Sequence, residues 1–397
     1  MSLANNIEFL RHLPKLNEFN GLGSLSRALR GGASRLVETT GFGSNPGDLR
    51  MFSFAPNDLP KTPALVVVLH GCTQNAAGYD VGAGWSALAE RYGFALLMPE
   101  QKPSNNANGC FNWFLPEDTT RDSGEACSIR QMIEQMVRTI GVDRESIFVT
   151  GLSAGGAMTS VMLATYPEIF AGGAIIAGLP YGIATNVQQA LKGMFQSPSR
   201  AAGELGDLVR NASKHKGRWP KLSVWHGSAD RTVNPSNADE IVKQWLDVHG
   251  LPAAPMSEAT VDGYPRQIWW NSEGETVIES YTITNMPHGT PLGTAENDER
   301  YGTEGVFLIE AGISSSYHIA NFFGLTERVR QPKPVAEPIL AAVPTHALEV
   351  VPALAARAAT GRRAEARDRP RRRAIDISAI INRALTAAGL IRSGDAT

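Results

Sequence analysis

Ser153 is the residue of this chain whose surroundings most clearly predict chemistry. It stands between two glycines in GLSAG, residues 151–155, after the β-branched run IFVT and before an apolar helical stretch from Met158 to Tyr166. A strand, a tight turn and a helix in this order strain the serine backbone and expose its hydroxyl, as a nucleophile requires. The five-residue pattern alone arises by chance in about one of every three or four chains of this size, so its partners have to support it.

A serine hydroxyl needs a histidine to accept its proton and a carboxylate to orient that histidine. Asp230 follows a predicted strand in WHGSADRTV, residues 225–233, and His288 follows another in NMPHGTP, residues 285–291. Loops in these places can present a side chain at the carboxyl edge of a sheet. We therefore predict Ser153 as nucleophile, Asp230 as acid and His288 as base, in the chain order typical of this motif.

Other side chains compete for the acid and base roles. Two aspartates fall within a predicted helix and a third lies in a polar turn, while the histidines lie in predicted helices, in an insertion or just before the acid loop. We favour structural or solvated roles for all of them, and a loop-ordering role for His226. These competitors are Asp239, Asp247, Asp262, His215, His226, His249 and His318.

The tetrahedral intermediate of acyl transfer needs two backbone N–H groups aimed at its oxyanion. The N–H of Ala154, next to the nucleophile, is the first candidate. The second should come from HGCTQ, residues 70–74, because His-Gly directly after an apolar strand is typical of an oxyanion loop. Cys72 is the predicted second donor, and a plain glycine turn is the alternative.

Metal and cofactor chemistry has no support in the sequence. The chain lacks a His-Glu-x-x-His pair and a glycine-rich phosphate loop, and Gly82-Ala83-Gly84 lacks the third glycine of a dinucleotide fingerprint. We expect no cofactor and no metal. A formal net charge of -2 gives no general attraction to nucleic acid. The sequence contains no apolar run of about 18 residues, so it predicts no transmembrane segment.

Short apolar runs alternating with helical stretches predict an α/β fold with a mostly parallel, doubly wound sheet and helices on both faces. With the serine motif after a central strand, this pattern is typical of an α/β-hydrolase. The predicted strands cover 64–69, 94–98, 147–150, 173–177, 222–225 and 277–283, and the predicted helices cover 85–92, 128–140, 158–166, 187–195 and 205–213.

The composition predicts three regions. Residues 1–44 contain an amphipathic segment, 45–325 form the catalytic domain, and 326–397 form a Pro/Ala/Arg-rich extension. Within the domain, the polar stretch 181–220 is either a lid or cleft wall, or a pair of ordinary surface helices.

The C-terminal extension is expected to be largely disordered, because its Pro- and Ala-rich sequence cannot form a hydrophobic core. It also carries arginines from Arg357 to Arg373, followed by an apolar helical face at Ile377, Ile381 and Leu385. A disordered extension with a docking helix is the favoured interpretation. The alternative is attachment to an anionic or lipid-coated surface such as a polymer granule.

In combination these segments resemble the polyhydroxybutyrate (PHB) depolymerase-like esterases, which are related to feruloyl and acetylxylan esterases. The resemblance extends over about residues 45–325 and is carried by LHGCTQ (69–74), NGCFNWF (108–114), GLSAGGAM (151–158), LPYG (179–182) and VWHGSAD (224–230). It implies a serine esterase acting on polymers or oligomers of short hydroxyalkanoates. A feruloyl- or acetylxylan-type carbohydrate esterase is the alternative.

The resemblance implies the same triad and oxyanion hole as the residue-by-residue reasoning. It also implies a disulfide between Cys72 and Cys110. Exposed aromatic side chains are implied to line a substrate groove, with Trp113 and Tyr181 as the substrate-binding candidates and core packing as the alternative for Trp113.

Two features depart from secreted members of the family. Ile183 and Gly193 stand where those members often carry further cysteines, and no export signal is recognisable. We therefore expect a cytoplasmic location, with secretion as the alternative that a disulfide would favour. A serine peptidase of this fold usually carries a large extra domain, which is not visible here. A non-catalytic granule- or surface-binding protein would need a broken triad, and all three residues are present.

Overall fold

The structure, a computed structural model, describes residues 35–327. The N-terminal amphipathic segment up to residue 34, the arginine run and the C-terminal helix lie outside the described residues. Ten strands form one sheet, in the order β1-β2-β4-β3-β5-β6-β7-β10-β9-β8. They are β1 (Val37–Thr39), β2 (Arg50–Phe54), β3 (Leu65–Leu69), β4 (Ala95–Glu100), β5 (Ile147–Leu152), β6 (Gly172–Ile176), β7 (Lys221–Gly227), β8 (Ser257–Val261), β9 (Tyr264–Trp270) and β10 (Thr276–Ile283).

The six predicted strands are the parallel centre of this sheet. Neighbouring pairs from β4 through β3, β5, β6 and β7 to β10 all run parallel. Four of these strands are completely buried, which explains why near-continuous apolar runs predicted them. The expected α/β fold with a mostly parallel sheet is confirmed.

Antiparallel strands extend the sheet at both edges, and the sequence analysis did not predict them. β1 and β2 continue from β4 on one side, and β9 and β8 continue from β10 on the other. β8 is largely exposed and has no apolar run, so strand assignment by buried β-branched residues missed it. A further two-stranded sheet joins β11 (Thr290–Leu292) and β12 (Leu308–Glu310) in parallel.

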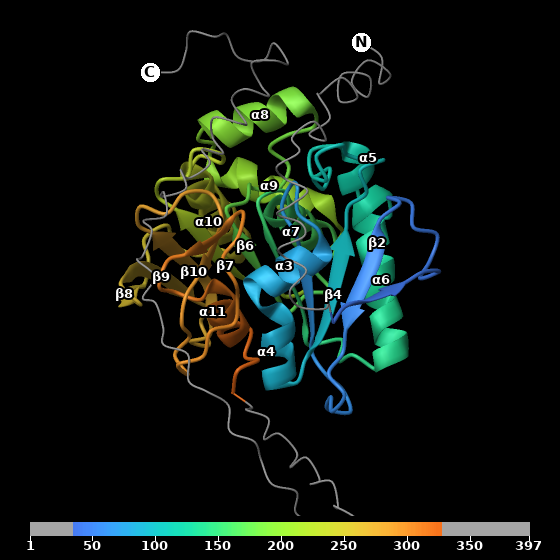
Figure 1. The fold of residues 1–397 in the computed structure, drawn as a ribbon. Coiled ribbons are helices and arrows are strands. Elements are labelled where there is room, and N and C mark those ends of the chain that lie inside the picture. Colours follow the sequence, from blue (N-terminus) through green and yellow to red (C-terminus); the bar gives the residue numbers. More distant parts are fainter. Residues whose placement is uncertain (1–34, 328–397) are drawn as a thin grey trace, which may run out of the picture. The chain divides into compact units, whose positions relative to one another are not determined.

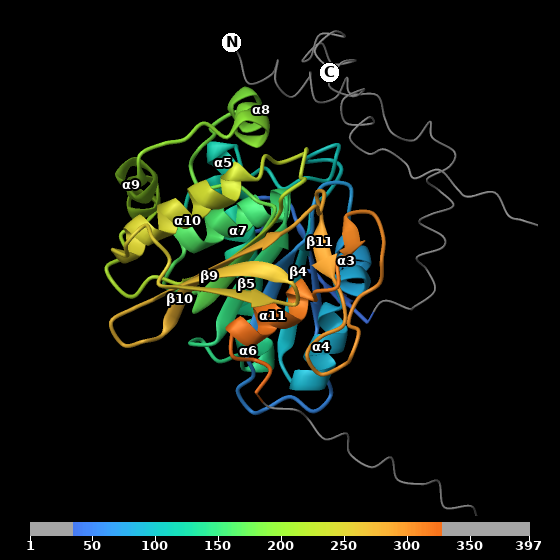
Figure 2. The same ribbon diagram turned by 90° about the vertical axis from the view of Figure 1, so that its left-hand side faces the viewer.

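Helices cover both faces of the sheet. Along β3, Leu65, Val67 and Leu69 belong to the core beneath α6, α7 and α10, while Val66 and Val68 belong to the core beneath α3, α4 and α11. Figure 2 shows α7 and α10 on one side of β9 and β10, with α11 and α4 on the other. The helices are α3 (Ala76–Ala83), α4 (Trp85–Tyr92), α5 (Pro116–Thr119), α6 (Gly124–Ile140), α7 (Ala154–Thr165), α8 (Val187–Gln196), α9 (Ala202–Ala212), α10 (Ser236–His249) and α11 (Ser315–Phe322).

The stretch between β6 and β7 contains α8 and α9, close to the two predicted helices. In Figure 1, α8 lies on the outside of the molecule, beyond α10 and α9. Within residues 35–327, no helix is both long and apolar enough to cross a membrane.

Candidate active site

The three candidate catalytic residues lie after the carboxyl ends of three parallel strands. Ser153 directly follows β5, Asp230 follows β7, and His288 follows β10. The carboxyl ends of parallel strands meet at one edge of a sheet, where open α/β folds bind their ligands. The loop that starts at His70 follows β3 and joins them there.

Ser153 occupies a strained turn between β5 and α7. Its backbone has φ 58° and ψ -117°, an uncommon conformation for a residue with a side chain. The Ser153 N–H donates to the Ile176 carbonyl at 2.9 Å, and its carbonyl accepts the Ala157 N–H at 2.8 Å. In the described part of the chain its hydroxyl forms no hydrogen bond and remains available to a substrate.

The two glycines that flank Ser153 are required by the close approach of three backbone segments. A Cβ at Gly155 would lie 2.5 Å from the His70 carbonyl oxygen and closer still to that of Leu69. A Cβ at Gly151 would lie 2.5 Å from the Gly155 carbonyl oxygen. The Gly-x-Ser-x-Gly spacing therefore lets α7 begin directly against the end of β3.

Asp230 and His288 are in direct contact. His288 Nδ1 lies 2.6 Å from Asp230 Oδ2, and both side chains are buried. Because an ionised carboxylate only accepts hydrogen bonds, Nδ1 carries the proton in this contact, which leaves Nε2 of the neutral ring as an acceptor. This is the tautomer that a general base for a serine hydroxyl needs.

The Asp230 carboxylate is further held by its own loop. Its Oδ1 accepts the N–H groups of Thr232 at 2.8 Å and Val233 at 2.9 Å. His226 Nε2 lies 3.1 Å from Oδ2 and 3.0 Å from the Val233 carbonyl. Burial by itself raises the pKa of Asp230, but the hydrogen bonds from His226 and His288 outweigh it and hold that pKa below its usual value.

The loops that carry Asp230 and His288 are joined by backbone hydrogen bonds. Ser228 N–H donates to the Ile283 carbonyl at 3.0 Å, and Ala229 N–H donates to the Met286 carbonyl at 3.1 Å. A Cβ at Gly227 would overlap the Met286 carbonyl oxygen, so this approach requires glycine. Asp230 and His288 are thus held together through main chain as well as side chains.

The candidate oxyanion donors are the N–H groups of Cys72 and Ala154. Neither N–H donates a hydrogen bond within residues 35–327. For Ala154 this follows from its place as the first residue of α7, where N–H groups have no intrahelical acceptor. A disulfide joins Cys72 to Cys110, and Thr73 N–H donates to the Asn108 carbonyl at 2.7 Å, so the two loops are tied together.

Comparison with known proteins identifies the family. The model of the family described as "Esterase PHB depolymerase" matches residues 53–262. The chain belongs to the esterase PHB depolymerase family. It is similar to poly(3-hydroxyalkanoate) depolymerase C of Paucimonas lemoignei, with 44% identity over 291 residues, which cover 73% of this chain and 70% of that protein.

Acetylxylan esterases are also similar to this esterase. That of Coprinopsis cinerea is 33% identical over 271 residues, covering 66% of this chain and 71% of the relative. The structure of an acetyl xylan esterase from Aspergillus awamori superposes with a TM-score of 0.62 at 25% identity, covering 74% of this chain and all of that one. The protein is accordingly a carboxylic ester hydrolase with an α/β-hydrolase fold.

His70 supports the candidate oxyanion loop of the esterase through hydrogen bonds of its ring to main chain. Its Nε2 accepts the Gln101 N–H at 3.1 Å, so the ring proton is on Nδ1, which donates to the Gly71 carbonyl at 2.8 Å. Burial lowers the pKa of His70 to about 4, so the ring stays neutral at physiological pH. The predicted His-Gly signal therefore marks a structural histidine.

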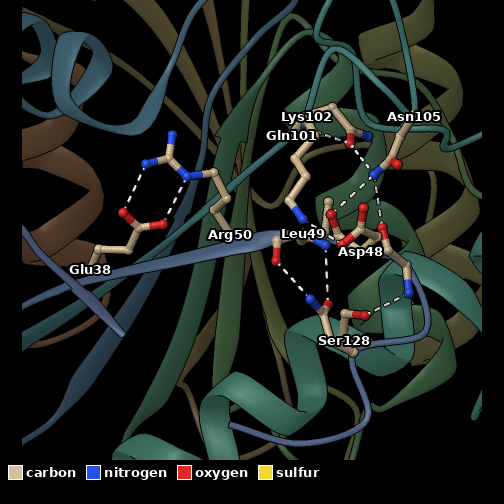
Figure 3. Close-up of polar contacts among 10 residues, drawn as sticks. Glu38, Asp48, Leu49, Arg50, Gln101, Lys102, Asn105 and Ser128 are labelled. Carbon is tan, nitrogen blue, oxygen red and sulfur yellow. Dashed lines mark hydrogen bonds and ion pairs between the residues drawn. The ribbon is translucent and has the colours of Figure 1, made fainter. Parts of the chain in front are cut away.

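A buried polar network extends from Gln101 to the loop of Cys110. Gln101 Nε2 donates to the Cys110 carbonyl at 3.0 Å and to Glu125 Oε1 at 2.5 Å. The Gln101 Oε1 accepts Asn105 Nδ2 at 2.9 Å, a contact that Figure 3 shows. The Glu125 carboxylate also accepts the N–H and the side-chain amide of Asn112 at 2.8 and 2.9 Å. Burial raises the pKa of Glu125 well above its usual value. No sequence motif signalled this network, because its members lie on separate segments.

The two candidate substrate-binding aromatics are not freely exposed. Trp113 is only 8% exposed and packs edge-on against Phe114, so the expectation of an exposed side chain is wrong. It lies in the same apolar core as buried residues of α6 and α7. Tyr181 is half-buried, and its main chain makes two 3.0 Å hydrogen bonds with the Gln244 amide. Substrate contact by either ring stays a prediction.

The competing acids and histidines lie elsewhere or play supporting roles. Asp239, Asp247 and His249 are on α10, and His215 lies between α9 and β7. Asp262, in the turn between β8 and β9, accepts a 2.9 Å hydrogen bond from His318 of α11. His226 orders the acid loop, as predicted, but the sequence analysis missed its contact with Asp230 itself.

Phe307 is a further residue that the sequence analysis missed. Its ring lies edge-on to His288, with ring centroids 5.6 Å apart. Its carbonyl accepts the Thr290 N–H at 2.8 Å, which holds the segment after His288. Among the described residues, no group of three or more His, Cys, Asp or Glu side chains could hold a metal ion.

Proposed function

We propose that this esterase works by two-step acyl transfer at Ser153. His288 Nε2 takes the hydroxyl proton as Ser153 Oγ attacks the ester carbonyl carbon, and the Cys72 and Ala154 N–H groups stabilise the oxyanion. The intermediate collapses with loss of the alcohol, which leaves with the proton from His288. Water then attacks the acyl-enzyme, with His288 again accepting a proton, and the acid and free Ser153 are released.

The 2.6 Å contact between His288 Nδ1 and Asp230 Oδ2 is the observation that carries this proposal. It fixes the tautomer in which Nε2 can accept a proton, and it stabilises the imidazolium that forms when it does. The depressed pKa of Asp230 keeps its carboxylate ionised throughout the working pH range. The left-handed turn at Ser153 supports the nucleophile role, because such strain persists where function requires it.

We further propose that the substrate is a polymer or oligomer of short hydroxyalkanoates. The support is the 44% identity to a poly(3-hydroxyalkanoate) depolymerase over most of both chains. Acetylated xylan or a feruloylated sugar is the second candidate, because acetylxylan esterases match most of the chain in sequence and in structure. Parallel assays on hydroxybutyrate oligomers, acetylated xylan and feruloylated sugars distinguish them by kcat/KM.

The mechanism is tested with Ser153→Ala and His288→Ala on short-chain nitrophenyl esters. Each substitution should lower kcat by about 10³-fold or more, with an unchanged melting temperature for Ser153→Ala. His215→Ala is the matched control, because that histidine lies in the segment between α9 and β7 and should leave kcat within about twofold. More than a trace of activity in Ser153→Ala would overturn the assignment.

The granule hypothesis for the C-terminal extension concerns residues outside the described part. Its test is deletion of residues 326–397 and sedimentation with polymer granules at low salt. Loss of co-sedimentation with unchanged hydrolysis of soluble esters supports a surface-binding tail, and unchanged partition removes the hypothesis.

A further inference from the structure

Gln74 ends the candidate oxyanion loop, residues 70–74, and no step of the proposed mechanism uses it. The loop contains a tight turn, in which the Gln74 N–H donates to the Gly71 carbonyl at 3.3 Å. Thr73, inside this turn, has φ 64°, a left-handed conformation that is uncommon for a residue with a side chain. A long hydrogen bond and a strained residue hold this turn only weakly through its main chain.

The Gln74 side chain closes the same turn from the other direction. Its Oε1 accepts the Gly71 N–H at 2.9 Å. Its Nε2 donates to the Val306 carbonyl at 3.2 Å. Because an N–H can only donate and a carbonyl can only accept, these two neighbours fix which end of the side-chain amide is oxygen and which is nitrogen. One planar amide group therefore binds both the loop and a segment distant from it in the sequence.

The hydrogen bonds of the loop determine which of its central N–H groups is free for an oxyanion. The Gly71 N–H is occupied by Gln74, and the Thr73 N–H is occupied by the Asn108 carbonyl at 2.7 Å. The Cys72 N–H, between them, donates to no acceptor in the described part of the chain. A donor for developing negative charge has to be free and aimed in advance. Gln74 thus helps to leave Cys72 as the available donor.

The nitrogen end of the Gln74 amide contacts the turn that packs against His288. Val306 and Phe307 form the centre of this turn, whose flanking residues exchange main-chain hydrogen bonds of 3.0 and 3.1 Å. The Phe307 ring lies edge-on to His288, with ring centroids 5.6 Å apart. A shift of the Val306 carbonyl therefore moves the ring that contacts His288.

The same turn is fixed to the residues that follow His288. The Phe307 carbonyl accepts the Thr290 N–H at 2.8 Å. A Cβ at Gly289 would lie 2.8 Å from that carbonyl oxygen, so the two segments approach each other closely. Both the ring and the main chain of Phe307 therefore contact the segment that carries the candidate base.

We propose that Gln74 is a positioning residue for ester hydrolysis, which aligns the Cys72 N–H and joins the candidate oxyanion loop to the turn beside His288. The proposal rests on the proposed function, because it assigns Gln74 a part in the same acyl transfer. The two hydrogen bonds of the Gln74 amide go to main chain, not to the three candidate catalytic residues. Its loss should therefore slow the chemical step and leave ester binding unchanged.

Gln74→Met tests the proposal, since methionine has a similar length and makes neither hydrogen bond. Loss of an oxyanion donor costs about 100-fold or more in kcat, so its misalignment should cost about tenfold on a nitrophenyl ester, with KM changed by less than about twofold. The melting temperature should fall by no more than about 5 °C, as expected for two partly exposed hydrogen bonds. Gln74→Asn, which stays polar but is one methylene shorter, should lower kcat in the same way.

A boronic acid distinguishes alignment of the oxyanion donors from loss of structure. The boron of butylboronic acid bonds to Ser153 Oγ and becomes tetrahedral and anionic, as the serine proton passes to His288, so the adduct resembles the intermediate. The inhibition constant should rise in Gln74→Met by about the same factor as kcat/KM falls. A role confined to stability would reduce the amount of folded enzyme and leave this inhibition constant unchanged.

A double-mutant cycle with Phe307→Leu tests the link to His288. If Gln74 acts partly through the turn that carries Phe307, the two effects are not independent. The double variant should keep at least about threefold more kcat than the product of the two fractional activities predicts. Gln267→Met is the matched control, because Gln267 is also half-buried and donates to Glu258 at 2.9 Å across β8 and β9; it should leave kcat within about twofold.

The proposal fails if Gln74→Met keeps kcat within about twofold of wild type, or if butylboronic acid inhibits that variant as strongly as wild type. It also fails if the effects of Gln74→Met and Phe307→Leu on kcat simply multiply. The proposed mechanism fails on a different result, esterase activity in Ser153→Ala, so the two failures are distinguishable.

Discussion

Gly155→Ala adds one methyl group at the place where α7 begins against the end of β3. The new Cβ would lie 2.5 Å from the His70 carbonyl oxygen and closer to that of Leu69, whereas ordinary contacts begin near 3.4 Å. Both are backbone carbonyls, one at the end of β3 and one in the candidate oxyanion loop, so they cannot swing aside as a side chain could. The start of α7 must therefore shift by about 1 Å, and it carries Ser153 and the Ala154 N–H with it.

A displacement of about 1 Å at the reacting atoms costs on the order of 100-fold in rate. We expect kcat on a nitrophenyl ester to fall by about that factor. The overpacked contact should lower the free energy of unfolding by about 1–3 kcal/mol. Steady-state kinetics and denaturant unfolding measure the two effects on the same preparation.

Gly203→Ala is the matched control. Gly203 is also the second residue of a helix, α9, but a Cβ there has nothing within 4 Å. This substitution should raise the free energy of unfolding by about 0.4–1 kcal/mol and leave kcat unchanged. If Gly155→Ala kept more than about a third of the wild-type kcat, the close approach of α7 and β3 would not position the nucleophile as argued.

Three further predictions concern the groups around the site. In Asp230→Asn, the amide oxygen should keep the two loop N–H groups and the NH₂ should face His288, which places the His288 proton on Nε2, the wrong tautomer for a base. The kcat should fall by roughly 10³–10⁴-fold with the fold intact. An unchanged rate would exclude Asp230 as the acid. The disulfide between Cys72 and Cys110 spans 38 residues, and its reduction should raise the number of thiols titrated in the denatured protein from one, that of Cys127, to three. Reduction should also lower the free energy of unfolding by about 2–4 kcal/mol and lower the esterase activity. Because the pKa of Glu125 is raised, the folded state holds this proton to higher pH than the unfolded state does. The contribution of Glu125 to the free energy of unfolding is therefore complete below about pH 4.5 and declines as pH rises. Glu125→Gln should remove that decline, and parallel pH profiles of the unfolding free energy for the two proteins would contradict this prediction.

Edge strands and buried polar contacts were the main features that local patterns could not predict. β8 is largely exposed and β9 is only partly buried, so the antiparallel pairing of β9 with β10 and of β8 with β9, not their own composition, makes them strands. Trp113 is buried in the apolar core that includes residues of α6 and α7, although it follows an asparagine-rich stretch of the sequence. The contact between His226 and Asp230 depends on a loop turning back on the strand that precedes it.

The sequence by itself determined the parallel centre of the sheet, because buried β-branched runs have few alternatives to a central strand. It also determined the turn at Ser153, since only glycine at 151 and 155 permits the backbone approaches found there. The tertiary structure decided which acid meets which histidine. Asp230 and His288 are 58 residues apart, and the adjacency of β7 and β10 brings them within 2.6 Å, whereas Asp262, in the turn before β9, pairs with His318 of α11. Local spacing fixes a turn through steric contact, but a hydrogen bond between distant loops exists only once the strands beneath them have paired.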